Sequence, residues 1–203
     1  MEKYQNLNCC RKELEDTKKY WNNLTEKISI KTPEDSINYI CNGWIFYQAY
    51  CCRMLAKSGY YQSGGAWGFR DQLQDSMCMK YFDLNIQKNQ IIRHCKHQFI
   101  EGDVLHWWHE ETGRGVRTKF SDDLLWLAYT VCDYIEFSGD YDILDIKIPY
   151  LAGEILEINS DEKYDFYGES EVSENVYLHC VRAIEKTLNY GVHGIPKIGR
   201  AHV

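Results

Sequence analysis

The chain has 203 residues, of which 44% are hydrophobic and 14% aromatic, and its formal net charge is -7. This composition supports a folded core and excludes a disordered or low-complexity protein, and the length suits one domain or part of a larger one. The acidic balance, without a block of Lys or Arg, argues against a nucleic-acid partner. The start is too polar for a signal peptide, and no apolar run approaches the roughly 20 residues that span a bilayer. We therefore expect a cytoplasmic protein, with no membrane contact from this segment.

The nine cysteines are scattered along the chain without the compact spacing of a disulfide framework. No C-x-x-C pair or Cys/His cluster at ligand spacing occurs, so no metal is expected. The sequence also contains no P-loop, no dinucleotide fingerprint, no G-x-S-x-G elbow and no H-E-x-x-H helix. We expect reduced thiols and no bound cofactor.

The first predicted elements are two helices. A polar helix over residues 4–28 carries a sparse apolar stripe formed by Leu7, Leu14, Trp21 and Leu24. The sequence TPED at residues 32–35 is typical of a helix start, with Pro at the first position and acids in the first turn. The second helix is predicted to continue through residue 58.

The middle of the chain alternates loops with helices. A glycine-rich loop over residues 63–68 leads into a short helix over 70–79, and residues 86–99 are again helical. Residues 100–120 are predicted to be irregular. Ser121, Asp122 and Asp123 then cap a helix that ends near residue 139 and is apolar nearly all round, so we expect this helix to be buried.

Connecting structure is predicted over residues 140–171, with a short helix and an extended stretch. Ser173 begins the last helix, and Gly191 closes it as a C-cap. Because helices dominate and no series of strands is apparent, the predicted fold class is all-α.

The stretch GGAWGFRDQLQD combines glycines, an aromatic ring and several hydrogen-bonding groups. Trp67, Arg70, Asp71 and Gln72 are its candidate substrate-binding residues. This mixture suits a sugar, whose hydroxyls are satisfied by carboxylate and guanidinium groups and whose apolar face stacks on a ring. In the alternative interpretation, Arg70 and Asp71 form a buried structural ion pair at a helix start.

The stretch EGDVLHWWHEETGRGVRTKFSDDLLW repeats this chemistry. Its candidate substrate-binding residues are Trp107, His109, Arg114, Arg117 and Asp122. Paired carboxylates can perform acid/base work in glycoside chemistry, but Asp122 and Asp123 are also explained as the N-cap and first-turn acid of the following helix. Of Trp107 and Trp108, at most one is expected to face a ligand.

Three stretches carry a resemblance to a known family: KTPEDSINYICNGWIFYQAYCCRM, YYQSGGAWGFRDQLQDSM and GDVLHWWHEETGRGVRTKFSDDLLWLAY. They closely resemble the catalytic domain of glycoside hydrolase family 94, inverting phosphorylases that include cellobiose and chitobiose phosphorylases and the C-terminal part of cyclic β-1,2-glucan synthases. The resemblance extends from about residue 20 to residue 199. It implies part of an (α/α)6 barrel of the six-hairpin glycosidase type, with a substrate pocket formed by loops at one end.

The resemblance also implies roles. The Arg-Asp pair of the family falls on Arg70 and Asp71, and the aspartate binds sugar hydroxyls in the donor subsite. Where cellobiose phosphorylases carry an additional arginine, this chain has Gly65, and its motifs are more similar to the branch acting on β-1,2-glucans. The implied reaction is phosphorolysis of a β-glucoside to an α-sugar 1-phosphate. The implied partners are a β-gluco-oligosaccharide and inorganic phosphate as co-substrate, and a homodimer of the full-length protein is a further option.

In the family, the catalytic acid lies in a G-D-W-N-D-G-M motif directly after a stretch like HGIPKIG. The resemblance therefore implies a general acid downstream of Gly199, but the chain departs from the motif at Arg200 and contains no W-N-D. We expect a fragment that lacks the acid, with residues 1–30 as a linker helix and residues 31–199 as the N-terminal part of the barrel.

Residues 200–203 are expected to be a non-native tail, because IGRAHV is encoded by a string that matches a common sequencing adapter. Two alternatives to the enzyme fragment remain. One is a non-catalytic sugar-binding module. The other is a hydrolase with a related barrel, for which Asp122 is a poor second carboxylate.

Overall fold

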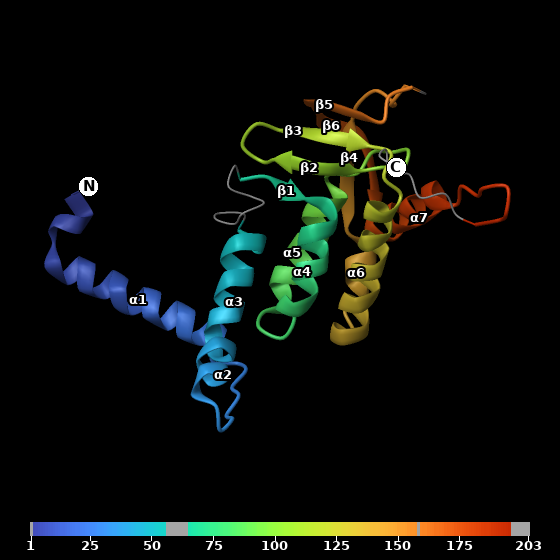
Figure 1. The fold of residues 1–203 in the computed structure, drawn as a ribbon. Coiled ribbons are helices and arrows are strands. Elements are labelled where there is room, and N and C mark those ends of the chain that lie inside the picture. The colour runs from blue at the N-terminus through green and yellow to red at the C-terminus, as the bar shows by residue number, and fades with distance from the viewer. Residues whose placement is uncertain (1, 56–64, 158, 196–203) are drawn as a thin grey trace.

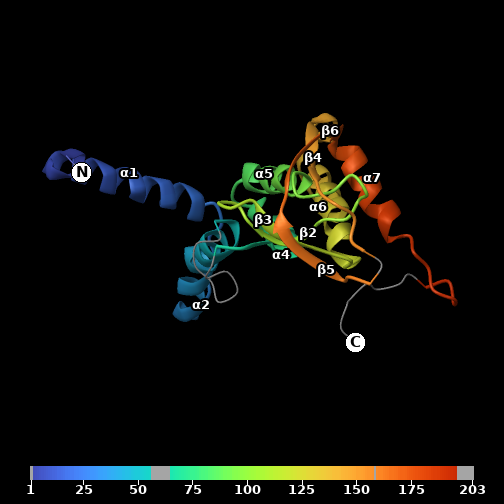
Figure 2. The same cartoon turned by 90° about the horizontal axis from the view of Figure 1, so that it is seen from above.

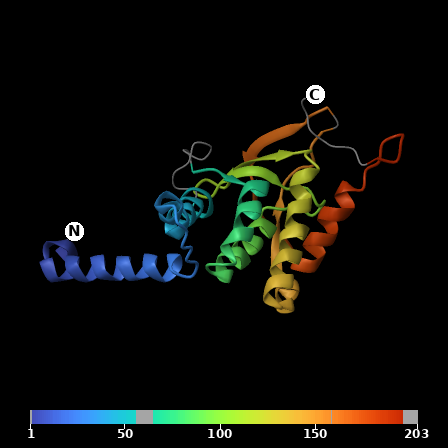
Figure 3. The ribbon, with the colours of Figure 1, turned by 60° about the horizontal axis from the view of Figure 1, so that its bottom comes forward.

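The computed structural model describes residues 2–55, 65–157 and 159–195 (Figure 1). After a 3-10 turn (η1, Glu2–Gln5), helix α1 (Leu7–Thr25) extends away from the rest of the molecule, as Figures 1 and 3 show. The Asn6 side chain caps it by accepting from the backbone N–H groups of Asn8 and Cys9. The predicted first helix is confirmed. The apolar stripe is buried only at the C-terminal end of the helix, where Leu24 joins a small core cluster. Leu7, at the start of the helix, is 64% exposed.

The second predicted helix exists but is broken. It runs as α2 (Asp35–Tyr39), η2 (Ile40–Trp44), α3 (Ile45–Gln48) and η3 (Ala49–Met54), where η2 and η3 are π-helical. Gly43 has a φ of 115°, and the Asn42 amide donates to the Ile30 carbonyl and accepts from the Ile30 N–H. These bonds and the glycine explain the kink. Glu34, one residue beyond Pro33, is the cap, since its carboxylate accepts from the Ser36 N–H.

Helices α4 (Phe69–Met79), α5 (Leu84–Cys95), α6 (Asp122–Ser138) and α7 (Val176–Thr187) form the body of the molecule. They pack α5 on α4, α4 on α6, and α6 on α7. Their inner faces bury the main core, which includes Leu73, Ile91, Leu127 and Val176. The predicted helix over residues 70–79 is confirmed as α4. The helix predicted over residues 86–99 is confirmed as α5 but ends earlier, at Cys95, because Gln98 and Phe99 form β-bridges.

A sheet lies across one end of this helix layer, as Figures 1 and 2 show. Its strands, in the order β1-β2-β3-β5, are β1 (Trp67–Gly68), β2 (Leu105–His109), β3 (Arg114–Thr118) and β5 (Glu162–Phe166), and all neighbours are antiparallel. A second pair joins β4 (Lys147–Ala152) to β6 (Gly168–Asn175), and a 3-10 turn, η4 (Tyr141–Asp145), precedes β4.

The predicted all-α class is therefore wrong for the described part of the chain, which mixes helices and sheets. The segment predicted to be irregular forms the β2–β3 hairpin. Gly113, with a φ of 62°, lies in its turn, and a Cβ on Gly115 would be 2.8 Å from both the Leu105 side chain and the Trp107 carbonyl oxygen. Gly113 therefore permits the tight turn, and Gly115 permits the close approach between strands.

Two expectations about helix burial and helix ends also need correction. Helix α6 is buried on one face only, since Leu125, Tyr129 and Phe137 are 44%, 59% and 49% exposed. The last helix begins at Val176, capped by Asn175, because the residues from 168 to 175 pair with β4. It ends at Thr187, before Gly191.

Some predicted features lie outside the described residues: the start of the glycine-rich loop, the end of the HGIPKIG stretch including Gly199, and the tail at residues 200–203. The expectation of a general acid downstream of Gly199 therefore stays a prediction. All nine cysteines lie within the described residues, and all are free thiols. Within the helices that the structure describes, none has the length and apolar character needed to cross a membrane.

Candidate functional site

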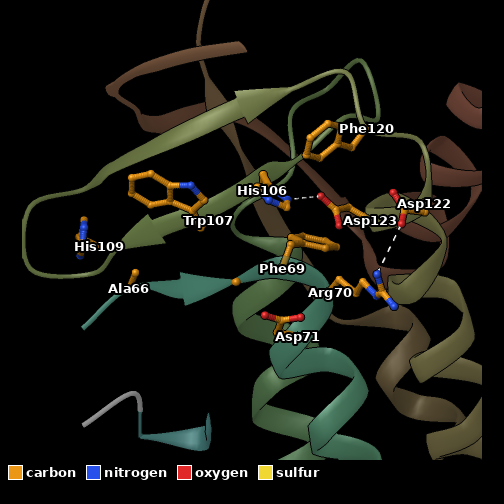
Figure 4. Close-up of a pocket in the computed structure, with 11 residues that line it drawn as sticks. Ala66, Phe69, Arg70, Asp71, His106, Trp107, His109, Phe120, Asp122 and Asp123 are labelled. Atoms are coloured by element: carbon orange, nitrogen blue, oxygen red, sulfur yellow. Dashed lines mark hydrogen bonds and ion pairs between the residues drawn. The ribbon is translucent and has the colours of Figure 1, made fainter. Parts of the chain in front are cut away.

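A pocket of about 570 Å³ lies where the sheet meets the helix layer, between β1, β2 and the first turns of α4 and α6 (Figure 4). The lining residues are Ala66, Gly68, Phe69, Arg70, Asp71, His106, Trp107, His109, Phe120, Asp122 and Asp123. The sheet brings both sequence motifs to this place, because β1 precedes α4 directly and pairs with β2. Of the predicted site residues, the structure brings Arg70, Asp71, Trp107, His109 and Asp122 together.

Arg70 and Asp71 occupy the first turn of α4, but they do not form the buried ion pair of the alternative interpretation. Arg70 Nη1 lies 3.7 Å from Asp122 Oδ2, and Arg53 Nη2 lies 3.4 Å from Asp71 Oδ2. The Arg70 side chain is 40% exposed, and the Asp71 side chain is 54% exposed. Both groups are therefore accessible from the pocket.

The tandem tryptophans face opposite sides of the sheet. Trp108 is 1% exposed and belongs to the core, whereas Trp107 is half-buried and lines the pocket, so only Trp107 of the two is placed to meet a ligand there. The Trp107 ring lies edge-on to His109, with centroids 5.5 Å apart. Figure 4 shows both side chains on the β2 wall. Trp107 thus offers a flat apolar surface beside the polar groups.

His106 and Asp123 form a hydrogen-bonded pair, although neither is among the substrate-binding residues predicted from the sequence. His106 Nδ1 lies 2.6 Å from Asp123 Oδ2, and Figure 4 shows this bond at the back of the pocket. Asp123 was interpreted only as a first-turn acid of the following helix, and it does lie in the first turn of α6. Regular alternation of strand side chains would place His106 and Trp107 on opposite faces of the sheet, but the strand is irregular between Leu105 and Trp107, and both residues line the pocket.

The charges around His106 set its protonation. Burial disfavours the imidazolium, but the hydrogen bond to Asp123 and the charges of Asp123, Asp71 and Asp122 outweigh burial and raise the pKa of His106 above 6.5. The pocket thus contains an imidazole that stays protonated to a higher pH than a free histidine. In the described part of the chain, no group of three or more His, Cys, Asp or Glu side chains could hold a metal ion.

Three predicted residues are buried and do not line the pocket: Arg117, Trp67 and Gln72. Arg117 is fully buried; its Nε and Nη2 donate to the two oxygens of Asp103 at 2.6 and 2.8 Å. Trp67 is 8% exposed, with the Arg93 guanidinium 4.2 Å from its ring centroid. Gln72 is fully buried, and its Oε1 accepts from the Gly68 N–H. All three lie outside the residues that line the pocket.

Arg114 lies at the start of β3, next to the hairpin turn, and is exposed. It faces Phe166 of β5 in the sheet register and is not among the residues that line the pocket. The structure therefore places Arg114 outside the pocket lining, across the hairpin from His109.

Comparison with known proteins places the chain in a family. Residues 20–203 match the model of the glycosyl hydrolase 94 superfamily, catalytic domain. Cyclic β-(1,2)-glucan synthase NdvB of Rhizobium meliloti is 39% identical over 189 residues, which are 91% of this chain. Solabiose phosphorylase of Paenibacillus borealis is 34% identical over 137 residues (66% of this chain), and N,N'-diacetylchitobiose phosphorylase of Vibrio proteolyticus is 25% identical over 213 residues (91%).

The chain spans 7%, 16% and 24% of the length of these three relatives, in the same order. The matched segment includes both motifs that form the pocket, and the family model extends over most of the chain. The chain therefore belongs to the glycosyl hydrolase 94 superfamily, within its catalytic domain.

Proposed function

We propose that the chain is part of an inverting glycoside phosphorylase that acts on β-linked gluco-oligosaccharides. The observation that carries this proposal is the convergence of Arg70, Asp71 and Trp107 on one pocket. The family supports it, because its matched relatives are named as phosphorylases or as a β-(1,2)-glucan synthase.

In this proposal the pocket binds the donor sugar. Asp71 accepts hydrogen bonds from sugar hydroxyls, Arg70 donates to them, and Trp107 packs against the apolar face of the pyranose. The pocket volume of about 570 Å³ is in the range of small-molecule sites. Inorganic phosphate attacks the anomeric carbon from the face opposite the leaving group and yields an α-sugar 1-phosphate. Because phosphate is already an anionic nucleophile, the reaction needs no general base, and it needs no further cofactor.

We also propose a fold for the chain and a position in the family sequence for the catalytic acid. Residues 31–199 form the N-terminal part of an (α/α)6 barrel, and the first 30 residues are a linker helix. The packed helices α4, α5, α6 and α7, with a site at one end of their layer, support this architecture. The acid that protonates the departing oxygen belongs to the W-N-D segment of the family, downstream of Gly199 and outside residues 1–203. We also propose a cytoplasmic location, supported by nine free thiols.

The test is the phosphate dependence of turnover. Protein containing this chain and the W-N-D segment, incubated with a β-linked glucose disaccharide, is expected to release sugar 1-phosphate only when inorganic phosphate is present. Cleavage that continues unchanged without phosphate would identify a hydrolase. Binding without cleavage under either condition would identify a non-catalytic sugar-binding module.

Asp71→Ala tests the assignment of the pocket. We expect its turnover to fall at least about a hundredfold, because the donor sugar loses the group that orients it. Asp16→Ala, in an exposed position of α1, is the matched control and should retain full turnover. Near-normal activity of Asp71→Ala would remove this carboxylate from the site.

A further inference from the structure

His106 lies on the pocket wall with a buried carboxylate behind its ring. Its Nδ1 donates to Asp123 Oδ2 at 2.6 Å, and the side chains of His106 and Asp123 are 40% and 3% exposed. The Phe120 ring packs edge-on against the imidazole, with centroids 4.7 Å apart. These two contacts fix the orientation of the ring.

The other ring nitrogen of His106 is available to a ligand. Among residues 2–55, 65–157 and 159–195, His106 makes no hydrogen bond other than the one to Asp123. Because Asp123 holds the Nδ1 proton, Nε2 carries a proton only when the ring is charged. Whatever occupies the pocket can therefore contact Nε2, and meets a donor there when the ring is protonated.

The charged groups around His106 favour that state. Asp71 and Arg70 come from α4, Asp122 and Asp123 from α6, and His109 from the same strand, β2. The carboxylates outweigh the burial of the ring and raise the pKa of His106. Since the shift from the ordinary value of 6.5 is upward, the charged form persists to a higher pH than in a free histidine and is lost as the pH rises through the raised pKa.

The same charges indicate what kind of ligand the Nε2 donor meets. The carboxylates of Asp71 and Asp122 lie beside the guanidinium groups of Arg53 and Arg70, so the pocket wall offers both hydrogen-bond acceptors and donors. A sugar hydroxyl is neutral, and it can accept from Nε2 while it donates to a carboxylate such as Asp71.

Resting on the proposed function, we infer that His106 is a substrate-binding residue that donates a hydrogen bond from Nε2 to a hydroxyl of the bound sugar. Asp123 is the positioning residue that orients and charges the ring. The pair thereby makes sugar binding depend on pH, although neither residue takes part in breaking the glycosidic bond.

The experiment is calorimetric titration of a β-linked glucose disaccharide at several pH values. Wild-type affinity should decline several-fold as His106 loses its proton. His106→Gln should bind about tenfold more weakly at low pH and show no such decline, because a neutral amide replaces a charged donor. His193→Gln, in an exposed turn far from the pocket, is the matched control and should behave as wild type.

Asp123→Asn tests the positioning role separately. Proton NMR titration of the His106 ring should show its pKa moving down toward 6.5, and the pH at which sugar affinity declines should move down with it. An unchanged His106 titration in this variant would overturn the role of Asp123.

The outcomes distinguish the inference from the proposal on which it rests. If wild type binds the disaccharide and His106→Gln binds it equally well with the same pH profile, the role of His106 is refuted and the proposed function stands. A pH profile that persists in His106→Gln assigns it to another group, such as His109, and also refutes the inference. If wild type does not bind the disaccharide at any pH, the proposed function and the inference fall together.

Discussion

Replacing Arg117 with alanine should destabilise the fold and leave the pocket in place. Arg117 lies on β3 with no exposed side-chain surface, and the Phe99 ring centroid is 3.7 Å from its guanidinium carbon. It forms a bidentate pair with Asp103, reaches Glu101 Oε2 at 3.0 Å, and donates to the carbonyl of Glu154 at 2.7 Å. The residue therefore ties the hairpin to the loop after β4.

The size of the expected loss of stability follows from the Asp103 charge that Arg117→Ala leaves unpaired. The Asp103 side chain is 9% exposed, so Arg117→Ala leaves a nearly buried carboxylate without its partner, whereas Glu101, at 28%, can be rehydrated. Breaking such a pair costs about 3–5 kcal/mol. For a domain of this size, each kcal/mol lowers the melting temperature by about 2–4 °C, so a decrease of about 6–20 °C is expected.

The assay is thermal unfolding followed by circular dichroism. Arg114→Ala on the same strand, where the side chain is exposed, is the matched control and should change the free energy of unfolding by less than about 0.5 kcal/mol. The double variant Arg117→Ala with Asp103→Asn should recover part of the loss, because no buried charge remains. If Arg117→Ala melts within about 2 °C of wild type, the structural role argued for Arg117 is refuted.

Two further predictions concern ion pairs. Arg53 contacts both Asp71 and Asp75, so Arg53→Met should raise the KM for the sugar several-fold with little change in melting temperature. Arg53→Lys should recover part of the affinity. An unchanged KM in Arg53→Met would show that Asp71 does not depend on Arg53 for sugar binding. Arg182 donates to both oxygens of Glu174 at 2.5 and 2.7 Å, and despite some burial this pair and the Tyr150 hydroxyl lower the pKa of Glu174 from 4.5 to about 2. This contribution to stability is present above pH 4.5 and is lost as the pH falls toward 2. Glu174→Gln should therefore be less stable than wild type by about 1–2 kcal/mol at neutral pH, after allowance for solvent screening, and this difference should vanish as the pH approaches 2. Urea unfolding at several pH values measures the difference. A difference that does not change with pH would contradict a role for the Glu174 charge.

Local signals predicted the helices well. The apolar stripe placed α1, and the helices α4 and α5 were also predicted, because helices form through contacts between residues three and four apart. The strands of the hairpin were missed because each has only five residues and the burial of their side chains does not alternate. In β3, the four residues from Gly115 to Thr118 are all buried. The pairing of β3 with β5 joins segments far apart in the chain, which no local window contains.

The site was predicted in part for a similar reason. Arg70, Asp71 and Trp107 were identified by residue type and family resemblance, and the fold brings them together. Residue type could not separate Arg117, buried in an ion pair, from an arginine that faces a ligand. The His106–Asp123 bond spans 17 residues of sequence and depends on the unpredicted hairpin. Contacts of this kind require the tertiary structure.

The most direct test of the account is a crystal structure of the protein with a bound β-linked glucose disaccharide. The account predicts a sugar ring packed against Trp107, with its hydroxyls within hydrogen-bond distance of the Asp71 carboxylate and of His106 Nε2. A disaccharide bound elsewhere, with this pocket containing only water, would contradict it.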